Sequence, residues 1–213
     1  FNINLDDYEK GKSIGQGAFG EVFLLTNKKT GEVCAGKMSM NLMQKGSSEA
    51  RDLTREINII YKISHPSIIK FIGYSPINFQ KEQRPVILTE YLPNKSLDKL
   101  NELSLSGLAP DEWDDTHKLI TLYGIASGMA FLHMHDIIHR DLKPANILMD
   151  SYLHPKICDF GLSKDENNAT QSTAAYKGTP LYSAPEIIDD FIYSKAGDVY
   201  AFAMIAYELF TNE

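Results

Sequence analysis

The sequence predicts an α+β chain with two lobes, a small lobe of antiparallel strands with one helix and then a mainly helical lobe. Up to about residue 90, short segments rich in β-branched and aromatic residues are separated by turn residues. After about residue 95, apolar residues recur at the helical period. A turn-rich segment, residues 92–96, lies where the two patterns meet. We therefore expect lobes at residues 1–92 and 93–213 that together form one domain.

The first lobe is expected to contain several strands and a single helix. The helix is predicted over residues 48–63, where Leu53, Ile57, Ile60 and Ile63 recur on one face. The stretch "KKTG", residues 28–31, indicates a hairpin turn. The strands are expected over residues 8–14, 21–26, 32–38, 68–74 and 86–91.

The second lobe is expected to consist mainly of two long helices. Two short strands, residues 146–149 and 155–158, are predicted between them. The last helix, residues 195–210, is apolar nearly all round, so it is expected to need cover on several sides. The earlier helix, residues 114–135, is expected to pack through Leu119, Leu122, Ile125, Met129 and Leu132.

Composition limits the classes of function. The 213 residues carry a formal net charge of −7, so binding to nucleic acid through bulk charge is disfavoured and no nucleic-acid partner is expected. The two cysteines, Cys34 and Cys158, lack metal-ligand spacing, which favours a reducing compartment and a cytoplasmic location. The longest apolar run is too short to span a bilayer. Composition leaves the oligomeric state open.

A glycine-rich stretch, "GQGAFGEV", occupies residues 15–22. Gly-x-Gly-x-x-Gly also occurs in dinucleotide-binding folds, where a helix follows it. Here the following residues, from Val22 to Leu25, predict a strand, so a dinucleotide oxidoreductase is disfavoured. A strand–turn–strand flap could place backbone amides over phosphates, because glycine has no Cβ. A plain glycine-rich hairpin remains the alternative.

Lys37 and Glu56 form a candidate ion pair. Lys37 lies on the third predicted strand, where a lone lysine is usually solvated. Glu56, however, lies on the apolar stripe of the predicted helix, and a partly desolvated carboxylate there requires a cation. A lysine held in this way can also bind a phosphate as a point charge.

The stretch "IIHRDLKPANILMD", residues 137–150, sets polar side chains between two apolar pairs. A polar loop between two strands would explain the polarity but not the mixture. A carboxylate, an ammonium, a guanidinium and a carboxamide lie close together, which favours the joint positioning of anions and a cation. The residues concerned are His139, Arg140, Asp141, Lys143 and Asn146.

Asp159 follows a predicted short strand and precedes Phe160 and Gly161. A carboxylate at the end of a strand is a reasonable Mg²⁺ ligand, because Mg²⁺ prefers hard oxygen ligands and substrate phosphates. A turn-capping role is the alternative for this residue alone.

Five motifs in this order resemble the signature of the protein kinase family: "GQGAFGEV", "CAGK", "HRDLKPAN", "DFG" and "APE". The resemblance runs from Tyr8 to the last residue. It implies a bilobal protein-kinase-like fold that uses ATP and Mg²⁺ and takes a protein substrate.

The resemblance also implies roles for individual residues. Lys37 would contact the α- and β-phosphates with Glu56 as its partner, and Asp141 would orient the substrate hydroxyl and accept its proton. Asn146 and Asp159 would hold Mg²⁺. The residues implied to cover the phosphates are Ile14, Gly15, Gln16, Gly17, Ala18, Phe19, Gly20, Glu21 and Val22. Those implied to hold adenine are Thr89, Glu90 and Leu92 at the hinge and Val22, Ala35 and Leu148 as an apolar clamp, for which simple core packing is the alternative.

Two residues bear on the substrate. Lys143 in "HRDLKPAN" and Thr179 in "GTPLYSAPE" resemble serine/threonine kinases, so transfer of the ATP γ-phosphate to protein Ser and Thr hydroxyls is implied. The stretches "FIGY" and "TEYLPNKSL" resemble the tyrosine-kinase-like group of those kinases.

Arg140 implies regulation, because in the family this arginine commonly receives an activation-loop phosphate. Ser172 and Thr173 are the favoured acceptors. The other hydroxyls of this loop are Ser163, Thr170 and Tyr176.

The sequence departs from the family pattern mildly at Tyr200 and Ala203, where tryptophan and glycine are common, and at two further places. Gly36 replaces a β-branched residue and is expected to loosen the packing beside Lys37. In the family, an arginine later in the chain pairs with the counterpart of Glu186, and this sequence has no such arginine. We therefore expect a fragment that is truncated at its C-terminus and weakly active alone. Asp198 matches the aspartate that ties the last helix to the catalytic loop. A scaffold that binds ATP without transferring phosphate is the alternative function.

Overall fold

The structure is a computed structural model that describes residues 1–17, 20–44, 46–165 and 176–211. It divides into two compact units. The first contains Phe1–Ile63 and Lys70–Tyr91, and the second contains Ser64–Ile69 and Leu92–Glu213. The short segment Ser64–Ile69 therefore packs with the second unit, although the sequence assigned it to the first lobe.

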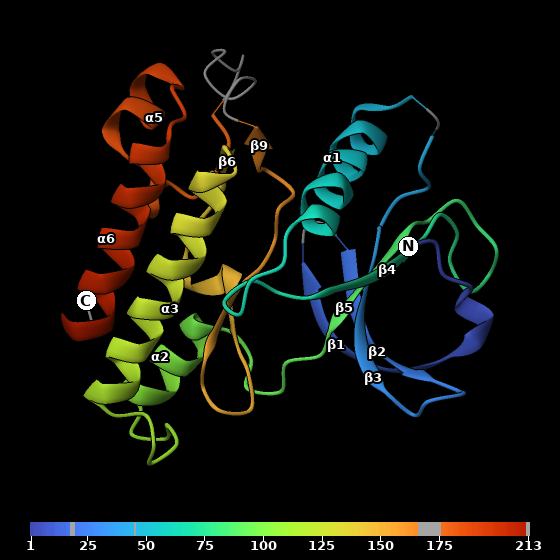
Figure 1. Cartoon of the computed structure of the whole chain (residues 1–213), viewed down its shortest axis with the longest axis horizontal. Helices are drawn as coiled ribbons and strands as arrows, with labels where there is room; N and C mark the ends of the chain where they lie inside the picture. Colours follow the sequence, from blue (N-terminus) through green and yellow to red (C-terminus); the bar gives the residue numbers. More distant parts are fainter. Residues whose placement is uncertain (18–19, 45, 166–175, 212–213) are drawn as a thin grey trace. The chain divides into compact units, whose positions relative to one another are not determined.

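The first unit is built on an antiparallel sheet with the strand order β1-β2-β3-β5-β4 (Figure 1). The predicted hairpin turn follows β2 and leads into β3. The strands are β1 Tyr8–Gly17, β2 Gly20–Asn27, β3 Val33–Met38, β4 Phe71–Ser75 and β5 Val86–Glu90.

One face of this sheet carries the core of the first unit. Side chains alternate between faces along a strand, and paired residues of neighbouring strands share a face. The buried residues on the core face are Phe23, Leu25, Cys34, Val86 and Leu88.

The helix of the first unit is α1, Ser48–Lys62 (Figure 1). It begins at Ser47, whose hydroxyl accepts a hydrogen bond from the Ala50 amide at 3.1 Å, as a helix N-cap does. Its apolar stripe buries Ile57 and Ile60. A single turn of 3-10 helix, η1 Leu5–Asp7, precedes β1.

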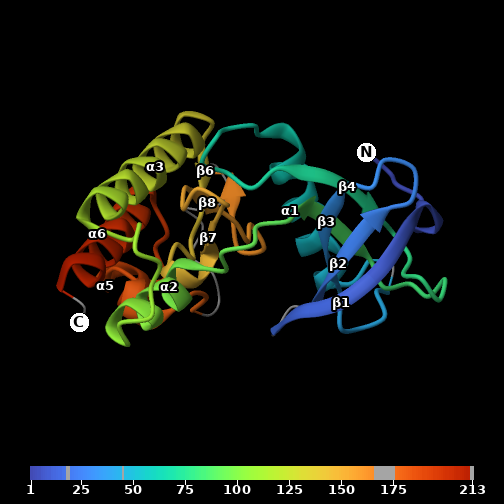
Figure 2. The ribbon, with the colours of Figure 1, turned by 90° about the horizontal axis from the view of Figure 1, so that it is seen from below.

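The second unit contains four helices among its described residues. Figures 1 and 2 show α3 and α6 side by side along most of their length. The helices are α2 Leu97–Leu105, α3 Asp115–Met134, α5 Pro185–Asp190 and α6 Lys195–Thr211. Neither α2 nor α5 was predicted from the sequence.

Short strands and 3-10 turns connect these helices. The strand β6, Ile137–Ile138, pairs with β9, Lys164–Asp165, and β7, Ile147–Met149, pairs with β8, Pro155–Ile157. The 3-10 turns are η2 Pro144–Asn146 and η3 Pro180–Tyr182.

Helix α3 packs closely against β8. A Cβ on Gly124 would come within 2.5 Å of Pro155, and one on Gly128 within 2.8 Å of Ile157, so the two glycines allow the close approach. The expectation that Leu119 packs inward was wrong, because this residue is 60% exposed. The buried face of α3 instead includes Thr121, Gly124 and Gly128.

None of the described helices is both long enough and apolar enough to cross a membrane.

Candidate functional site

The glycine-rich stretch forms the turn from β1 to β2. Gln16 pairs with Glu21, and Gly17 pairs with Gly20. Gly20 has a φ of +148°, and a Cβ there would overlap the backbone oxygen of Met38, so only glycine fits this position. Ala18 and Phe19, at the tip of the predicted flap, lie outside the described residues.

The predicted apolar and cationic residues of the first unit share one face of the sheet. Val22 pairs with Lys37 across β2 and β3, and Ala35 pairs with Thr89 across β3 and β5. All four are only partly buried, while their neighbours Phe23, Cys34 and Leu88 point into the core. The face opposite the core therefore presents these four side chains together, near the glycine turn.

Lys37 forms the predicted ion pair with Glu56. The distance from Lys37 Nζ to Glu56 Oε1 is 3.2 Å, and the side chains are 28% and 13% exposed. The pair joins β3 to α1 and fixes the ammonium group on the face described above. Because Glu56 is the more buried partner, the lysine also offsets the cost of desolvating its carboxylate.

The end of β5 is fixed through Glu90. Its backbone amide donates to the Lys70 carbonyl at 3.0 Å, and its carboxylate accepts from the Lys70 amide at 2.8 Å. In the second unit, Leu148 is half-buried between two fully buried neighbours, Ile147 and Met149. Leu148 therefore faces away from the core, and Leu92 is half-buried as well.

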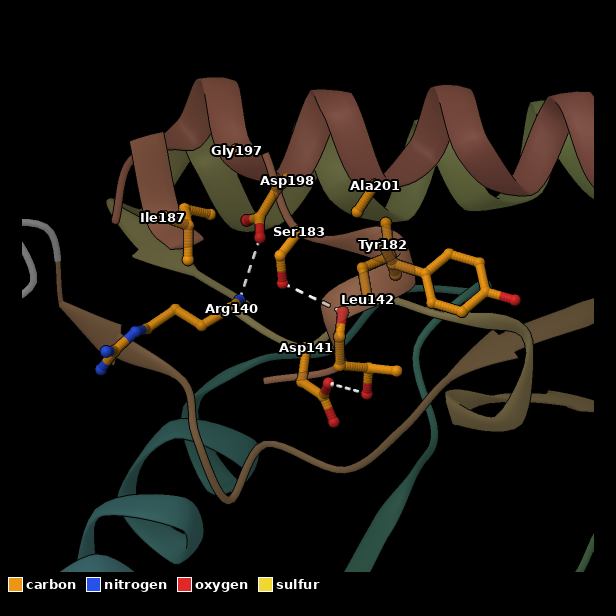
Figure 3. A pocket seen from close by; sticks show the side chains of 10 residues that line it. Arg140, Asp141, Leu142, Tyr182, Ser183, Ile187, Gly197, Asp198 and Ala201 are labelled. Carbon is orange, nitrogen blue, oxygen red and sulfur yellow. Dashed lines mark hydrogen bonds between the residues drawn. The ribbon is translucent and has the colours of Figure 1, made fainter. Parts of the chain in front are cut away.

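The polar loop after β6 is held by Asp198 of α6. Asp198 is 3% exposed and accepts hydrogen bonds from the backbone amides of His139 and Arg140, each at 2.9 Å. Figure 3 shows the Asp198 carboxylate facing the backbone nitrogen of Arg140. His133 Nε2 lies 2.9 Å from the same carboxylate. The predicted link between the last helix and this loop is thus present.

His139 supports the loop from inside. Its side chain is fully buried, with Nε2 3.2 Å from the Cys158 carbonyl and its ring edge-on to Phe160 at 5.5 Å between centroids. Its carbonyl accepts a hydrogen bond from the Ser163 hydroxyl at 3.1 Å. Ser163 is fully buried, so it is a poor candidate for modification in the folded protein.

Asp141, Lys143 and Thr179 form a closed triangle of polar contacts. The Thr179 hydroxyl donates to Asp141 Oδ1 at 2.8 Å, and Lys143 Nζ lies 2.8 Å from Asp141 Oδ2. Lys143 Nζ also donates to the Thr179 oxygen at 2.7 Å. A carboxylate, an ammonium group and a hydroxyl thus meet at one point. Figure 3 shows Asp141 at the edge of a small cavity that Asp198, Leu142 and Ser183 also line.

Asn146 is attached to the same loop. Its amide nitrogen donates to the Asp141 carbonyl at 2.8 Å and to Asp141 Oδ2 at 3.2 Å. Both donor bonds use the nitrogen, which leaves the carboxamide oxygen as the group able to coordinate a cation. Asp159 is half-buried and has a φ of +64°, a conformation that turns the backbone sharply after β8.

The structure describes Arg140 but only part of the predicted phosphorylation loop. The Arg140 side chain is buried, and its guanidinium carbon lies 3.6 Å from the centroid of the Tyr193 ring. The favoured acceptors, Ser172 and Thr173, lie outside the described residues, as does Thr170. Tyr176 is half-buried, and burial raises the pKa of its phenol.

Sequence reasoning missed the residues that anchor the segment after this loop. Tyr193 is fully buried and bonds to the backbone of Lys177, and the Tyr182 hydroxyl donates to Glu208 at 2.6 Å. Burial, together with the Glu208 carboxylate, raises the pKa of Tyr182. The local sequence around a buried tyrosine does not show that it anchors another segment, because its hydrogen-bond partner lies elsewhere along the chain.

Comparison with known proteins agrees with the motifs and the fold. The protein kinase domain family matches residues 8–213. The chain is 32% identical over 204 residues to the serine/threonine-protein kinase fused of Drosophila melanogaster, covering 96% of this chain and 24% of that protein. It is 33% identical over 213 residues to the Aurora kinase of Saccharomyces cerevisiae, covering 99% of this chain and 54% of that protein.

A third relative is the cysteine-rich receptor-like protein kinase 6 of Arabidopsis thaliana, 34% identical over 212 residues, which are 97% of this chain and 30% of that protein. The chain therefore spans between about a quarter and a half of the length of these relatives.

The chain belongs to the protein kinase family. Residues 8–213 are a protein kinase domain, and serine/threonine-protein kinases are among the relatives of the chain. The predicted fold class, with a small antiparallel sheet and helical elements, is confirmed, and so is the predicted family.

Proposed function

We propose that the whole protein transfers the γ-phosphate of Mg·ATP to serine and threonine hydroxyls of a protein substrate. The observation that carries this proposal is the arrangement around Asp141. Its Oδ1 already accepts a hydrogen bond from an aliphatic hydroxyl, that of Thr179, at 2.8 Å. A carboxylate at this distance from a hydroxyl is within reach to orient it and to accept its proton.

Lys143 is proposed to stabilise the phosphate that is being transferred. Its ammonium group lies 2.8 Å from Asp141 and 2.7 Å from the Thr179 oxygen. A cation held beside the base can interact with negative charge that develops on the phosphate as it passes to the hydroxyl. We propose that Thr179 keeps this lysine and Asp141 in register.

In the first unit, Lys37 is proposed to bind the α- and β-phosphates, with Glu56 fixing its side chain. Val22, Ala35 and Thr89 share a sheet face with Lys37, which supports a role in adenine binding. We extend the same role to Glu90, Leu92 and Leu148. The backbone from Ile14 to Val22, including Gly15, Gln16, Gly17, Gly20 and Glu21, is proposed to cover the phosphates.

Asn146 and Asp159 are proposed to hold Mg²⁺. Bound Mg²⁺ would neutralise phosphate charge. Both residues offer hard oxygen atoms, and the Asn146 oxygen is left available by the bonds that its amide nitrogen makes to Asp141, so the residues fit this ion. Among the described residues, no three His, Cys, Asp or Glu side chains gather as a metal site, so phosphate and water oxygens would complete the coordination.

Arg140 is proposed to receive a phosphate on Ser172 or Thr173, which would order the loop through charge-assisted hydrogen bonds. We also propose membership of the tyrosine-kinase-like group, from "FIGY" and "TEYLPNKSL". A cytoplasmic location is proposed from the cysteine content, because the chain has only two cysteines and they lack metal-ligand spacing. The net charge of −7 supports a protein rather than a nucleic-acid partner.

The test is the transfer of labelled γ-phosphate to a generic serine/threonine substrate by the full-length protein. The control is Asp141→Asn, which keeps the shape of the side chain but removes its basicity. Label on serine and threonine that the variant loses would support the proposal. Tight binding of Mg·ATP without transfer by the wild-type protein, after treatment with an activating kinase, would favour a nucleotide-binding scaffold instead.

A further inference from the structure

Tyr193 is a fully buried side chain that the proposed reaction does not use. It lies between α5 and α6 and packs with Ala184 and Ile187. Burial of a phenol is costly unless its hydroxyl is hydrogen-bonded. The partners of that hydroxyl therefore indicate what this residue holds in place.

Both bonds of the hydroxyl go to the backbone of a single residue, Lys177. The Lys177 amide donates to the Tyr193 oxygen at 2.7 Å, and the Tyr193 hydroxyl donates to the Lys177 carbonyl at 2.6 Å. Lys177 belongs to no helix or strand, so this pair of bonds replaces the ones that regular structure would supply.

The segment that Tyr193 holds leads directly to the proposed base. Lys177 is two residues before Thr179, whose hydroxyl donates to Asp141 Oδ1 at 2.8 Å. A second set of bonds keeps the segment compact: the Tyr176 hydroxyl lies 2.7 Å from Ser183 Oγ, which donates to the Thr179 carbonyl at 3.0 Å.

The ring of Tyr193 contacts Arg140, which belongs to the loop that carries Asp141. The Arg140 guanidinium carbon lies 3.6 Å from the ring centroid, a cation–π distance. Arg140 directly precedes Asp141, and its amide is bonded to Asp198 at 2.9 Å. The contacts therefore close a ring from Asp141 through Thr179, Lys177, Tyr193 and Arg140 back to Asp141.

We propose that Tyr193 is a positioning residue for phosphoryl transfer: its hydroxyl fixes Lys177, and through it Thr179, against the loop that carries Asp141. This inference rests on the proposed function. Tyr193 is fully buried, so its effect on the reaction is indirect. It acts on the step in which Asp141 orients the hydroxyl, because the Thr179 and Asp141 side chains remain in contact only while the segment stays in place.

The first test is Tyr193→Phe in the full-length protein, which keeps the ring and its contact with Arg140 but removes the hydroxyl. We expect kcat to fall about tenfold, from the loss of two hydrogen bonds, with the KM for ATP unchanged. The control is Tyr74→Phe, in β4 of the other unit, which removes the hydroxyl of a half-buried tyrosine and is expected to leave kcat unchanged.

The second test asks whether Tyr193 acts through Thr179. With Thr179→Ala already present, Tyr193→Phe should lower kcat by less than twofold, because the contact that it supports is gone; coupled residues are non-additive in this sense. A purely structural role for Tyr193 would instead lower kcat by the same factor in both backgrounds.

The third test does not depend on activity. The Lys177 side chain is exposed, so trypsin can cleave after it once the backbone is released. We expect Tyr193→Phe to speed cleavage at the Lys177–Gly178 bond about tenfold relative to the wild-type and Tyr74→Phe proteins, as followed by mass spectrometry.

Unchanged cleavage, unchanged kcat or full additivity with Thr179→Ala would each overturn the inference. If the wild-type protein transfers phosphate while Tyr193→Phe behaves like it, the inference fails and the proposed function stands. If the wild-type protein transfers no phosphate, the proposed function fails first, and the rate of cleavage then reports on the Lys177 anchor alone.

Discussion

Thr179 occupies a position where one hydroxyl serves two partners at once. It donates to the Asp141 carboxylate and accepts from the Lys143 ammonium group. The Thr179 hydroxyl is thus a donor and an acceptor at the same time, so the side chains of Thr179, Asp141 and Lys143 restrain one another. An alanine at this position would leave Lys143 and Asp141 with a single direct contact and more freedom to move.

Thr179→Ala is therefore expected to lower kcat by about ten- to a hundredfold, which corresponds to about 1.4–2.7 kcal/mol of transition-state stabilisation. Thr179→Ser keeps the hydroxyl and should retain most of the activity. Steady-state kinetics of the full-length protein on a peptide substrate measure both. Equal loss in the two variants would show that the methyl group, rather than the hydroxyl, is what matters.

His65 gives the second unit a pH dependence. Burial, with a contribution from Lys156, lowers the pKa of its imidazole, and its Nδ1 accepts a hydrogen bond from the Ser67 amide at 3.1 Å. The folded state therefore favours neutral His65. Its contribution to stability is complete above the unfolded pKa of about 6.5 and is lost as the pH falls toward the lowered folded pKa.

We expect the free energy of unfolding to drop between pH 7.5 and 5.5 by more in the wild-type protein than in His65→Asn. Urea unfolding of both proteins at the two pH values measures this difference. A wild-type protein that gains stability relative to the variant on acidification would show that the sign is wrong.

Local sequence was enough to propose chemical roles for individual residues, but it did not reveal the residues that support them. Asp141, Asn146 and Asp159 could be proposed because they stand in motifs that resemble those of the family. Tyr193 and His133 could not, because what they do depends on Lys177 and Asp198, which are brought close only by the fold. A buried aromatic or a histidine at the end of a helix has the same local pattern whether or not it anchors a loop.

At the level of elements, the long and strongly periodic segments were predictable. The β3 strand and α3 differ from their expected bounds by a residue at most, since alternation and helical period mark them clearly. The helices α2 and α5 and the pair β6 with β9 were not predicted. Their two to nine residues are too few to show a period, and β6 is defined only by its partner.

Gly36 of β3 was expected to loosen the sheet, and the structure contradicts this. It is buried, and a Cβ there would lie 2.9 Å from Leu25 Cδ1 and 3.1 Å from Phe23 Cε2. The side chains of β2 have thus taken the space that a β-branched residue would fill. The glycine is required by its neighbours, which a reading of β3 alone could not reveal.

Gly36→Ala is expected to lower the free energy of unfolding by about 1–3 kcal/mol, the usual cost of overpacking. Adding Leu25→Val should recover part of this loss, because it removes the atoms that the new methyl group meets. Chemical denaturation of the two single variants and the double variant gives the coupling. Strict additivity would mean that Leu25 is not the residue in the way.

At the level of the whole molecule, the chain crosses between its two compact units more often than the sequence indicated. Ser64–Ile69 belongs to the second unit, where Ile69 and Ser67 form backbone hydrogen bonds with Ile157 at 2.9 and 2.8 Å. These hydrogen bonds join segments that are far apart in the sequence, and local sequence patterns do not reveal them. The sequence therefore predicted a single boundary near residue 92 and missed the assignment of Ser64–Ile69 to the second unit.

The proposed ligand Mg·ATP is expected to stabilise the folded protein, because it would bind the folded state and not the unfolded chain. At one hundred times the dissociation constant, binding adds about 2.7 kcal/mol, which should raise the melting midpoint by about 5–10 °C. Thermal unfolding with Mg·ATP, compared with ATP plus a chelator, measures the effect. Asp159→Asn should lose the part that needs Mg²⁺; an unchanged shift in that variant would remove Asp159 from the proposed metal site.

The bonds of Asp198 occupy one place in the backbone where an anion could otherwise bind. Two successive amides, those of His139 and Arg140, point the same way, and Arg140 has a φ of +72°. Such a backbone concavity is a ready anion receptor. Here the protein fills it with its own carboxylate, so no phosphate can bind there. The proposed nucleotide would therefore be held by side chains and by other parts of the backbone, such as the glycine turn between β1 and β2.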